Sequence, residues 1–365
     1  MLSLSTFRQG GNLRNLTSNE ILRNDLNDSD SFFLKIRNAK KIMVLDQGFL
    51  GDTIQLMPSV YRIRQSCPAC ELHVMVEKRV VGLFDFFPWV DRVWGYQRHP
   101  ISEPIWKQPP HIAKLRKEKF DAVINLNGSQ RSSWLTWATG AKWRLGREPQ
   151  RKKFFWSSFF TETIYVPFQG HIARQRYQVL DQAGFPEYPF SYGSSIPDDL
   201  LKNAKLQLGD IKRFIHISPF TTEDKKELNE KTMIELLNAL NDSKFNNIAL
   251  SCSSDEREIR KMKSLLKKLD FTPSKVFSGG LSMIEFATIV SLSDLHVGGP
   301  SGSIHVASMM NVPIVCWFRD HKEIDEWGPA GKHDKIFIGE ETEKGIVGIE
   351  AEDILKAILA YSVKK

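Results

Sequence analysis

The chain has 365 residues, of which 41% are hydrophobic and 25% are charged, and its formal net charge is +7. This length favours two domains, and no apolar run is long enough to predict a membrane span. The amino terminus lacks the apolar segment of a signal peptide, and four cysteines exclude a disulfide framework, so we predict a cytoplasmic protein. The basic charge is typical of proteins that bind nucleic acid, a phosphorylated glycolipid or an anionic membrane, and equally of soluble proteins without such a partner.

Apolar runs alternate with helical patterns through most of the chain, which predicts parallel sheets. Strands are expected at 42–45, 72–76, 93–94 and 122–126 in the first half, and at 214–217, 247–250, 276–277, 295–297 and 313–318 in the second. Helices are expected at 78–87, 112–119, 171–183, 233–240, 255–269, 282–291, 304–310 and 351–363. The fold class predicted is α/β, with two Rossmann-like domains whose parallel sheets face a central cleft.

The segment 184–197 is rich in proline and glycine and is the best candidate for the linker between the domains. We predict an N-terminal extension at 1–40 with a helix from Ser18 to Arg37, a first domain at 41–190, a second domain at 191–345 and a C-terminal helix within 346–365 that could pack back on the first domain.

The first glycine loop follows the strand at 42–45. Gly48 and Gly51 mark a tight turn, and after Asp52 the apolar residues recur at helical spacing. Because ligands bind at the carboxyl ends of parallel strands, the carboxylate of Asp52 is well placed to meet a substrate.

A second glycine turn, Gly298-Gly299-Pro300-Ser301-Gly302, lies between a strand and a helix in the other half. Backbone N–H groups at a helix N-terminus attract a diphosphate, and glycines let it approach closely. Ser301, Gly302 and Ser303 would supply these donors. His305, in the first turn, could hydrogen-bond a phosphate or simply pack.

Two further features have competing interpretations. The stretch 131–160 is rich in Trp, Lys and Arg, which can bind sugars and phosphates, although Trp at helical spacing also fills cores. Cys67 and Cys70 form a single CxxC, which falls short of the four ligands of a zinc site, so we predict a structural role.

The segment from Gly51-Asp52 to Pro58 resembles the first signature of the lipopolysaccharide heptosyltransferase family, glycosyltransferase family 9. The turn from Gly298 and the strand after it resemble the donor-site signature of this family. Trp327-Gly328-Pro329 matches the end of a third motif. The resemblance extends over about residues 41–350 and implies the two-domain GT-B fold.

The resemblance also implies roles for individual residues. Asp52 would be the general base, with Gly48 and Gly51 shaping its loop. The donor phosphates would be bound by Thr221, Thr222, Lys226, Ser301, Gly302, Ser303 and His305, with Lys225 as the alternative to Lys226. The chain departs from the family where Pro300 replaces the usual Asp of the glycine turn, and where Glu227 follows Lys226 instead of Trp-Pro. Acceptor contact is expected for Arg131, Arg144 and Lys152.

The function predicted from the resemblance is an inverting transfer of a sugar, with ADP-heptose as the expected donor, onto a lipopolysaccharide core or related glycan. No metal, cofactor or nucleic-acid partner is expected, and peripheral contact with the inner membrane is compatible with the charge. The alternative is a GT-B protein that binds a sugar nucleotide or glycan without catalysis, or that uses a different donor. The altered donor loop favours this alternative, whereas Asp52 argues against it.

Overall fold

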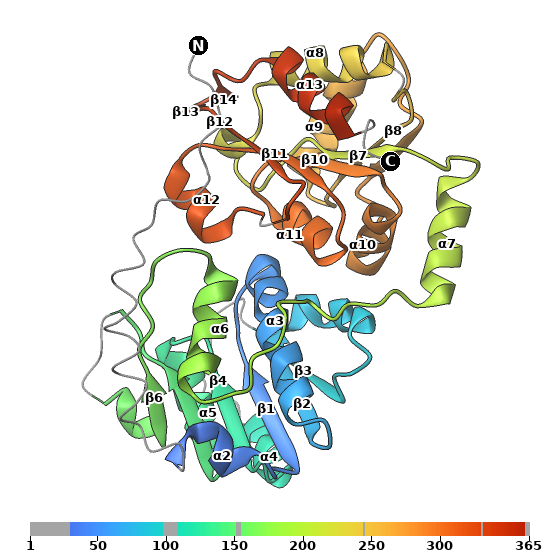
Figure 1. Cartoon of the computed structure of the whole chain (residues 1–365). Helices are drawn as coiled ribbons and strands as arrows, with labels where there is room; N and C mark the ends of the chain where they lie inside the picture. The colour runs from blue at the N-terminus through green and yellow to red at the C-terminus, as the bar shows by residue number, and fades with distance from the viewer. Residues whose placement is uncertain (1–29, 98–108, 151–154, 244, 330, 362–365) are drawn as a thin grey trace.

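The computed structural model describes residues 30–97, 109–150, 155–243, 245–329 and 331–361, and each half of the chain contributes one six-stranded parallel sheet (Figure 1). The first sheet has the order β3-β2-β1-β4-β5-β6. Its strands are β1 (Lys41–Leu45), β2 (Glu71–Glu77), β3 (Arg92–Tyr96), β4 (Ala122–Asn125), β5 (Trp143–Arg147) and β6 (Glu162–Ile164).

Helices cover both faces of this sheet, which is why β1 is an unbroken apolar run. Ile42 and Val44 face a core shared with α2 (Phe32–Ile36), α3 (Leu50–Ser66) and α6 (Ile172–Gln182), whereas Met43 and Leu45 face α4 (Pro109–Lys117) and α5 (Gln130–Ala138). The remaining helical segments of this half are 3₁₀ helices, η3 (Lys78–Phe86) and η5 (Ser157–Phe159).

The second sheet has the order β12-β11-β10-β7-β8-β9. Its strands are β7 (Ile215–Ser218), β8 (Ile248–Cys252), β9 (Lys275–Ser278), β10 (Leu295–Gly298), β11 (Ile314–Phe318) and β12 (Lys335–Ile338). The helices are α7 (Asp198–Leu208), α8 (Glu230–Asn241), α9 (Glu256–Leu266), α10 (Met283–Ser291), α11 (Gly302–Met309), α12 (His321–Trp327) and α13 (Ala351–Tyr361), with η6 (Asp224–Lys226) and the hairpin β13 (Glu340–Thr342) and β14 (Gly345–Val347).

Two helices of the second half form the layer that meets the first half. In Figure 1, α10 and α11 lie between the second sheet and the first half. Residues of α11 and β11 belong to the same apolar cluster as residues of β1 and α3. The core therefore continues from one half into the other.

Two expectations about the helices are wrong. The C-terminal helix α13 packs on α8 and β11 of the second half, because Ile354 and Ile358 extend the apolar core on that face. The helix expected from Ser18 to Arg37 is not continuous: Ser31 has an extended backbone and caps α2, while residues 18–29 lie outside the described part. The helix expected at 78–87 is confirmed, as a 3₁₀ helix.

The segment between α6 and α7 contacts both halves. Gly193 accepts a hydrogen bond from Trp89 Nε1 at 2.7 Å, and Ser194 Oγ donates to the carbonyl of Met309 at 2.8 Å. Gly193 has φ +65°, and a Cβ there would lie 2.6 Å from the ring of Tyr61, so this position requires glycine. A domain boundary close to residue 190 stays a prediction.

Within the described ranges, none of the helices has both the length and the apolar character needed to cross a membrane.

Candidate active site between the two halves

Asp52 lies in the first turn of α3, directly after the carboxyl end of β1. Its Oδ2 accepts a hydrogen bond from the backbone N–H of Phe49 at 3.1 Å. Gly48 is required beside it, because a Cβ on Gly48 would come within 2.1 Å of the Cβ of Asp52. The glycine loop therefore folds tightly around this carboxylate, as the sequence predicts for Gly48.

Arg176 of α6 joins Asp52 to a second carboxylate, that of Asp46. Its Nη2 lies 2.6 Å from Asp46 Oδ2 and 3.2 Å from Asp52 Oδ1, and its Nη1 donates to the main-chain carbonyl of Asp52 at 2.8 Å. The Asp46 side chain is fully buried and that of Arg176 is 3% exposed, whereas that of Asp52 is 26% exposed. Asp52 is thus the carboxylate of this group that solvent reaches.

The surroundings raise the pKa of Asp52 above its ordinary value. Burial is the main cause and the nearby charge of Asp46 adds to it, while the guanidinium of Arg176 opposes both. A carboxylate with a raised pKa is a stronger base than an exposed one, which suits removal of a proton from a hydroxyl group.

On the other half, the glycine turn after β10 packs against the loop after β7. A Cβ on Gly299 would lie 3.0 Å from Lys226 O, from Thr221 Cγ2 and from Trp317 Nε1. Ser301 caps α11, with its Oγ 3.4 Å from the N–H of Ser303. The structure therefore brings Thr221, Lys226 and residues 299–303 together.

Lys226, and not Lys225, is the lysine placed beside the turn. Its ammonium pairs with Glu223 Oε1 at 3.1 Å and with Glu323 Oε1 of α12 at 3.3 Å, and its side chain is 18% exposed. Lys225 instead pairs with Glu343 of the β13–β14 turn at 2.6 Å. An incoming diphosphate at Lys226 would compete with two carboxylates.

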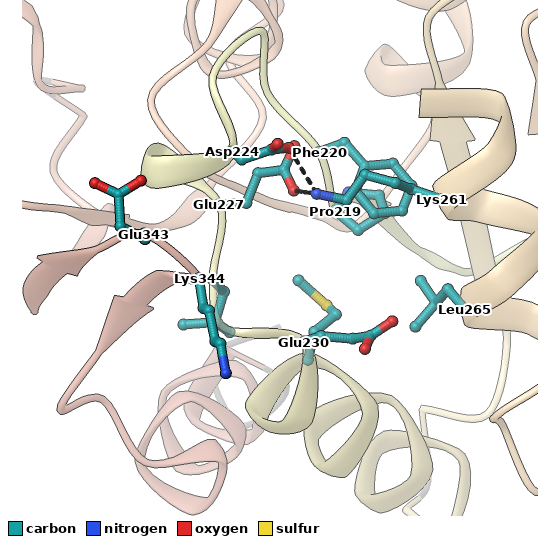
Figure 2. A pocket seen from close by; sticks show the side chains of 11 residues that line it. Pro219, Phe220, Asp224, Glu227, Glu230, Lys261, Leu265, Glu343 and Lys344 are labelled. Carbon is teal, nitrogen blue, oxygen red and sulfur yellow. Dashed lines mark hydrogen bonds and ion pairs between the residues drawn. The ribbon is translucent and has the colours of Figure 1, made fainter. Parts of the chain in front are cut away.

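The loop that carries Lys226 packs against α9. A pocket of about 180 Å³ lies there, and Lys261 pairs in it with Asp224 at 2.8 Å and with Glu227. Figure 2 shows these side chains around the pocket. Thr221 is buried and bonds to Glu223 within the loop, so it shapes the loop, whereas Thr222 is exposed. The sequence gives no sign of these supports, because α9 is predicted only as a charged amphipathic helix.

His305 does not join the donor-side group. Its Nδ1 lies 3.1 Å from Gln55 Nε2 of α3, and a Cβ on Gly51 would come within 2.7 Å of its Cδ2. Burial lowers the pKa of His305 to about 4, so the imidazole is neutral at pH 7. Of the two alternatives for His305, the structure supports packing between the halves, because His305 lies on the face of α11 that meets α3; a phosphate contact stays a prediction.

The three residues expected to contact an acceptor have different surroundings. Arg131 begins α5 after the carboxyl end of β4 and hydrogen-bonds Tyr96 at the end of β3, at the same sheet edge as Asp52. Arg144 lies near the start of β5, and its Nε and Nη1 donate to the carbonyls of Phe159 and Ala141 at 2.9 and 2.6 Å. These contacts give Arg144 a structural role. Lys152 lies outside the described residues.

The tryptophans of the same stretch are divided between core and surface. Trp156 is buried, whereas Trp137 is 46% exposed and contacts the ring of Phe159. Arg147, which the sequence does not single out, is buried at the end of β5 and donates to Gln175 of α6. Its side chain therefore supports the helix that carries Arg176.

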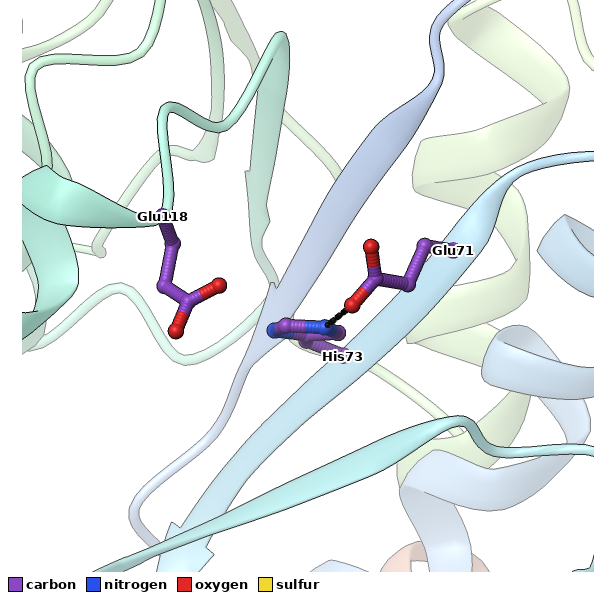
Figure 3. A group of neighbouring side chains, drawn as sticks. All are labelled: Glu71, His73 and Glu118. Carbon is purple, nitrogen blue, oxygen red and sulfur yellow. Dashed lines mark hydrogen bonds and ion pairs between the residues drawn. The ribbon is translucent and has the colours of Figure 1, made fainter.

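One group in the described residues has the composition of a metal site, Glu71, His73 and Glu118 (Figure 3). Trp94 Nε1–H donates to His73 Nδ1 at 3.1 Å, so His73 Nε2 carries its hydrogen and donates to Glu71 at 2.7 Å. The ammonium of Lys41 lies 3.1 Å from Glu71 and 2.8 Å from Glu118. The cation between these carboxylates is thus a lysine, and the group ties the amino ends of β1 and β2.

Cys67 and Cys70 are free and buried in the core at the end of α3. Burial raises the pKa of Cys67 to about 12, so it stays a thiol at pH 7. This agrees with the structural role predicted for them.

The two halves meet through α3 and α11, each of which begins after a central strand of its sheet. Two doubly wound sheets joined in this way form the GT-B fold of glycosyltransferases. The chain belongs to glycosyltransferase family 9 (heptosyltransferase), whose family model matches residues 110–352.

Individual relatives agree with this family. The chain is 23% identical over 291 residues to a lipopolysaccharide core heptosyltransferase, OpsX, of Haemophilus influenzae, covering 78% of this chain and 80% of that protein. In fold it is similar to a family 9 glycosyltransferase of Veillonella parvula, with a TM-score of 0.77, 18% identity and coverage of 89% and 98%. It is also similar to the heptosyltransferase WaaC of E. coli solved with ADP, with a TM-score of 0.72, 18% identity and coverage of 88% and 99%.

Proposed function

We propose that the protein transfers heptose from ADP-heptose, with inversion, to a hydroxyl group of a lipopolysaccharide core or a related phosphorylated glycan. The observation that carries the proposal is the position of Asp52, held by Arg176 at the carboxyl end of β1 on the half opposite Lys226 and the turn at 299–303. Family membership and the names of the curated relatives support the choice of heptose.

In the proposed mechanism Asp52 accepts the proton of the acceptor hydroxyl while that oxygen attacks the anomeric carbon. The bond from this carbon to the diphosphate breaks, and ADP leaves with the electron pair. The negative charge on the leaving group is stabilised by Lys226 and by N–H groups of Gly302 and Ser303 in the first turn of α11. These positive groups would supply what a metal ion supplies in other transferases.

On the acceptor side, Arg131 is the residue we retain as a ligand for a phosphorylated sugar. It begins a helix at the sheet edge that carries Asp52, and it keeps a partner in Tyr96. We also propose a cytoplasmic location with peripheral contact at the inner membrane, which would suit a phosphorylated glycolipid acceptor. This location stays a prediction.

The alternative is a GT-B protein that binds the nucleotide but does not transfer heptose. Two observations favour it: Lys226 already pairs with two carboxylates, and Pro300 stands where the family has an Asp. The purified chain should be incubated with ADP-heptose and lipopolysaccharide core acceptors, and the product analysed by mass spectrometry. An acceptor heavier by one heptose is the expected result. Saturable ADP binding without any product would favour the alternative.

A further inference from the structure

A cavity of about 360 Å³ lies between the two halves at the far end of α11 from the glycine turn. One wall comes from the start of α6 and from residues 190–192 of the segment that joins the halves. The other comes from Ser308 to Pro313 and from residues 331–334 before β12. We call it the linker cavity. Ser301 and Ser308 are separated by about 10 Å along the helix, so the cavity is distinct from the donor-side turn.

The rim of the linker cavity is positively charged. Arg174 and Lys332 line it beside His333, and neither cation has a carboxylate within ion-pair distance among the described residues. The carboxylate among the lining residues, Asp334, is already used: its Oδ1 accepts from Ile314 N–H at 3.0 Å and its Oδ2 from Gly331 N–H at 2.6 Å. Arg174 and Lys332 together outweigh the single carboxylate of Asp334, so the cavity carries a net positive charge that favours an anion.

The inner part of the cavity is lined by aromatic rings. The rings of Phe190 and Tyr192 lie 6.0 Å apart, and the guanidinium of Arg174 lies 5.8 Å from the ring of Phe190. Ser308 and His171 also line the cavity, although Ser308 Oγ and His171 Nε2 themselves are buried behind its wall and have no hydrogen-bond partner among the described residues.

We propose that the linker cavity binds a small aromatic or heterocyclic phosphate monoester, with its phosphate at Arg174, Lys332 and His333 and its ring against Phe190 and Tyr192. The volume is within the range of small-molecule sites, and charge-assisted hydrogen bonds from an arginine and a lysine suit a phosphate.

Binding there would favour the arrangement in which the two halves touch, because each half supplies one wall. The cavity is also connected to the contact between the halves. Tyr192 OH donates to Gln55 Oε1 at 3.2 Å, and the same Gln55 side chain contacts His305 of α11. A ligand that orders Tyr192 would therefore support the α3–α11 contact beside Asp52.

The test uses the full chain and phenyl phosphate as the probe, in calorimetry and thermal unfolding. Saturable binding is expected, with a rise in Tm, with at least tenfold weaker binding of inorganic phosphate, and with no competition from ADP. The double variant Arg174→Ala/Lys332→Ala should lose at least tenfold in affinity for phenyl phosphate and keep its ADP affinity. Arg260→Ala/Lys263→Ala removes two surface cations of α9 and should bind as the unaltered protein does.

Three results would overturn the proposal: no saturable binding of phenyl phosphate, equal loss in both double variants, or displacement of the probe by ADP. Equal affinity for inorganic phosphate would show that the ring wall is not used. None of these measurements requires turnover, so they stand apart from the outcome of the heptose-transfer assay.

Discussion

Arg176 holds Asp52 at two points, its main-chain carbonyl at 2.8 Å and its carboxylate at 3.2 Å. The same guanidinium pairs with the fully buried Asp46. One cation thus fixes the turn that presents Asp52 and supplies the countercharge for a second, fully buried carboxylate, whose Oδ1 also accepts hydrogen bonds from Gly48 N–H and Asn127 Nδ2.

Asp52→Asn should lower kcat for heptose transfer by about 10²- to 10⁴-fold, the usual contribution of a general base, and leave ADP affinity unchanged. Because the folded-state pKa of Asp52 is raised, its stabilising contribution is present at acid pH and is lost as pH rises through that pKa. The substitution is therefore not expected to lower Tm at pH 7. A variant that turns over at the original rate would exclude Asp52 as the base.

The pH dependence of kcat/KM should respond in opposite directions to two changes around Asp52. The rate should fall on the acid side of the Asp52 pKa, because only the ionised carboxylate accepts a proton. Asp46→Asn removes a repelling charge, so this acid limb should move to lower pH. Arg176→Gln removes an attracting charge, so the limb should move to higher pH.

The same two variants distinguish a role of Asp46 and Arg176 in positioning Asp52 from a role in the stability of the fold. Arg176→Gln leaves Asp46 buried without its partner and should cost about 3–5 kcal/mol in the free energy of unfolding. Urea unfolding measures this loss. If both variants lose activity with identical pH profiles, the network serves the fold and not the base.

Lys226→Ala should weaken ADP binding by about 1.5–3 kcal/mol, the scale of a hydrogen bond to a charged group. Lys225→Ala is the matched control, because this neighbour pairs with Glu343 away from the turn and should leave ADP affinity unchanged. Calorimetry with ADP compares the two. Equal affinities in both variants and the unaltered protein would place the phosphate site elsewhere.

Pro300 should relax selectivity for the transferred sugar while ADP binding is kept. Pro300 lies one residue before the N-cap Ser301, so its missing N–H takes no donor from the helix and the N-terminus of α11 remains available to the diphosphate. It cannot supply the carboxylate of the family turn. A panel of ADP-sugars should show similar affinities, and Pro300→Asp should increase the preference for heptose. Strict selection of ADP-heptose by the unaltered chain would contradict this.

Gly51→Ala should disturb the contact between the halves, because the new Cβ would lie 2.7 Å from His305 Cδ2. We expect a loss of about 1–3 kcal/mol in the free energy of unfolding, as for other overpacked sites, and a lower kcat. Gly280→Ala is the control, since no atom lies within 4 Å of a Cβ there and its φ is ordinary. Equal Tm values for the two variants would show that the contact between Gly51 and His305 accommodates the extra methyl group without loss of stability.

Local patterns in the sequence are enough to predict the central strands of both sheets, most of the helices and the first turn of the site, whereas β5, β6, β12 and the β13–β14 hairpin are not predicted. The run at 42–45 is apolar because β1 is covered on both faces, and Asp52 follows it by a few residues, so the position of the carboxylate at a sheet edge needs no tertiary information. The capping box of Ser282 and Glu285 is likewise local and is present at the start of α10.

Contacts between distant segments were decided only by the tertiary structure. Arg176 and Asp52 are 124 residues apart, and His305 and Gln55 are 250 apart, so no spacing rule connects them. The position of α13 is a further example. Its sequence predicts an apolar stripe but not which half the stripe contacts, and in the structure it packs against the apolar face of α8. Helical periodicity predicts which residues lie on one face of a helix. The segment that packs against this face depends on how the two sheets are arranged in space.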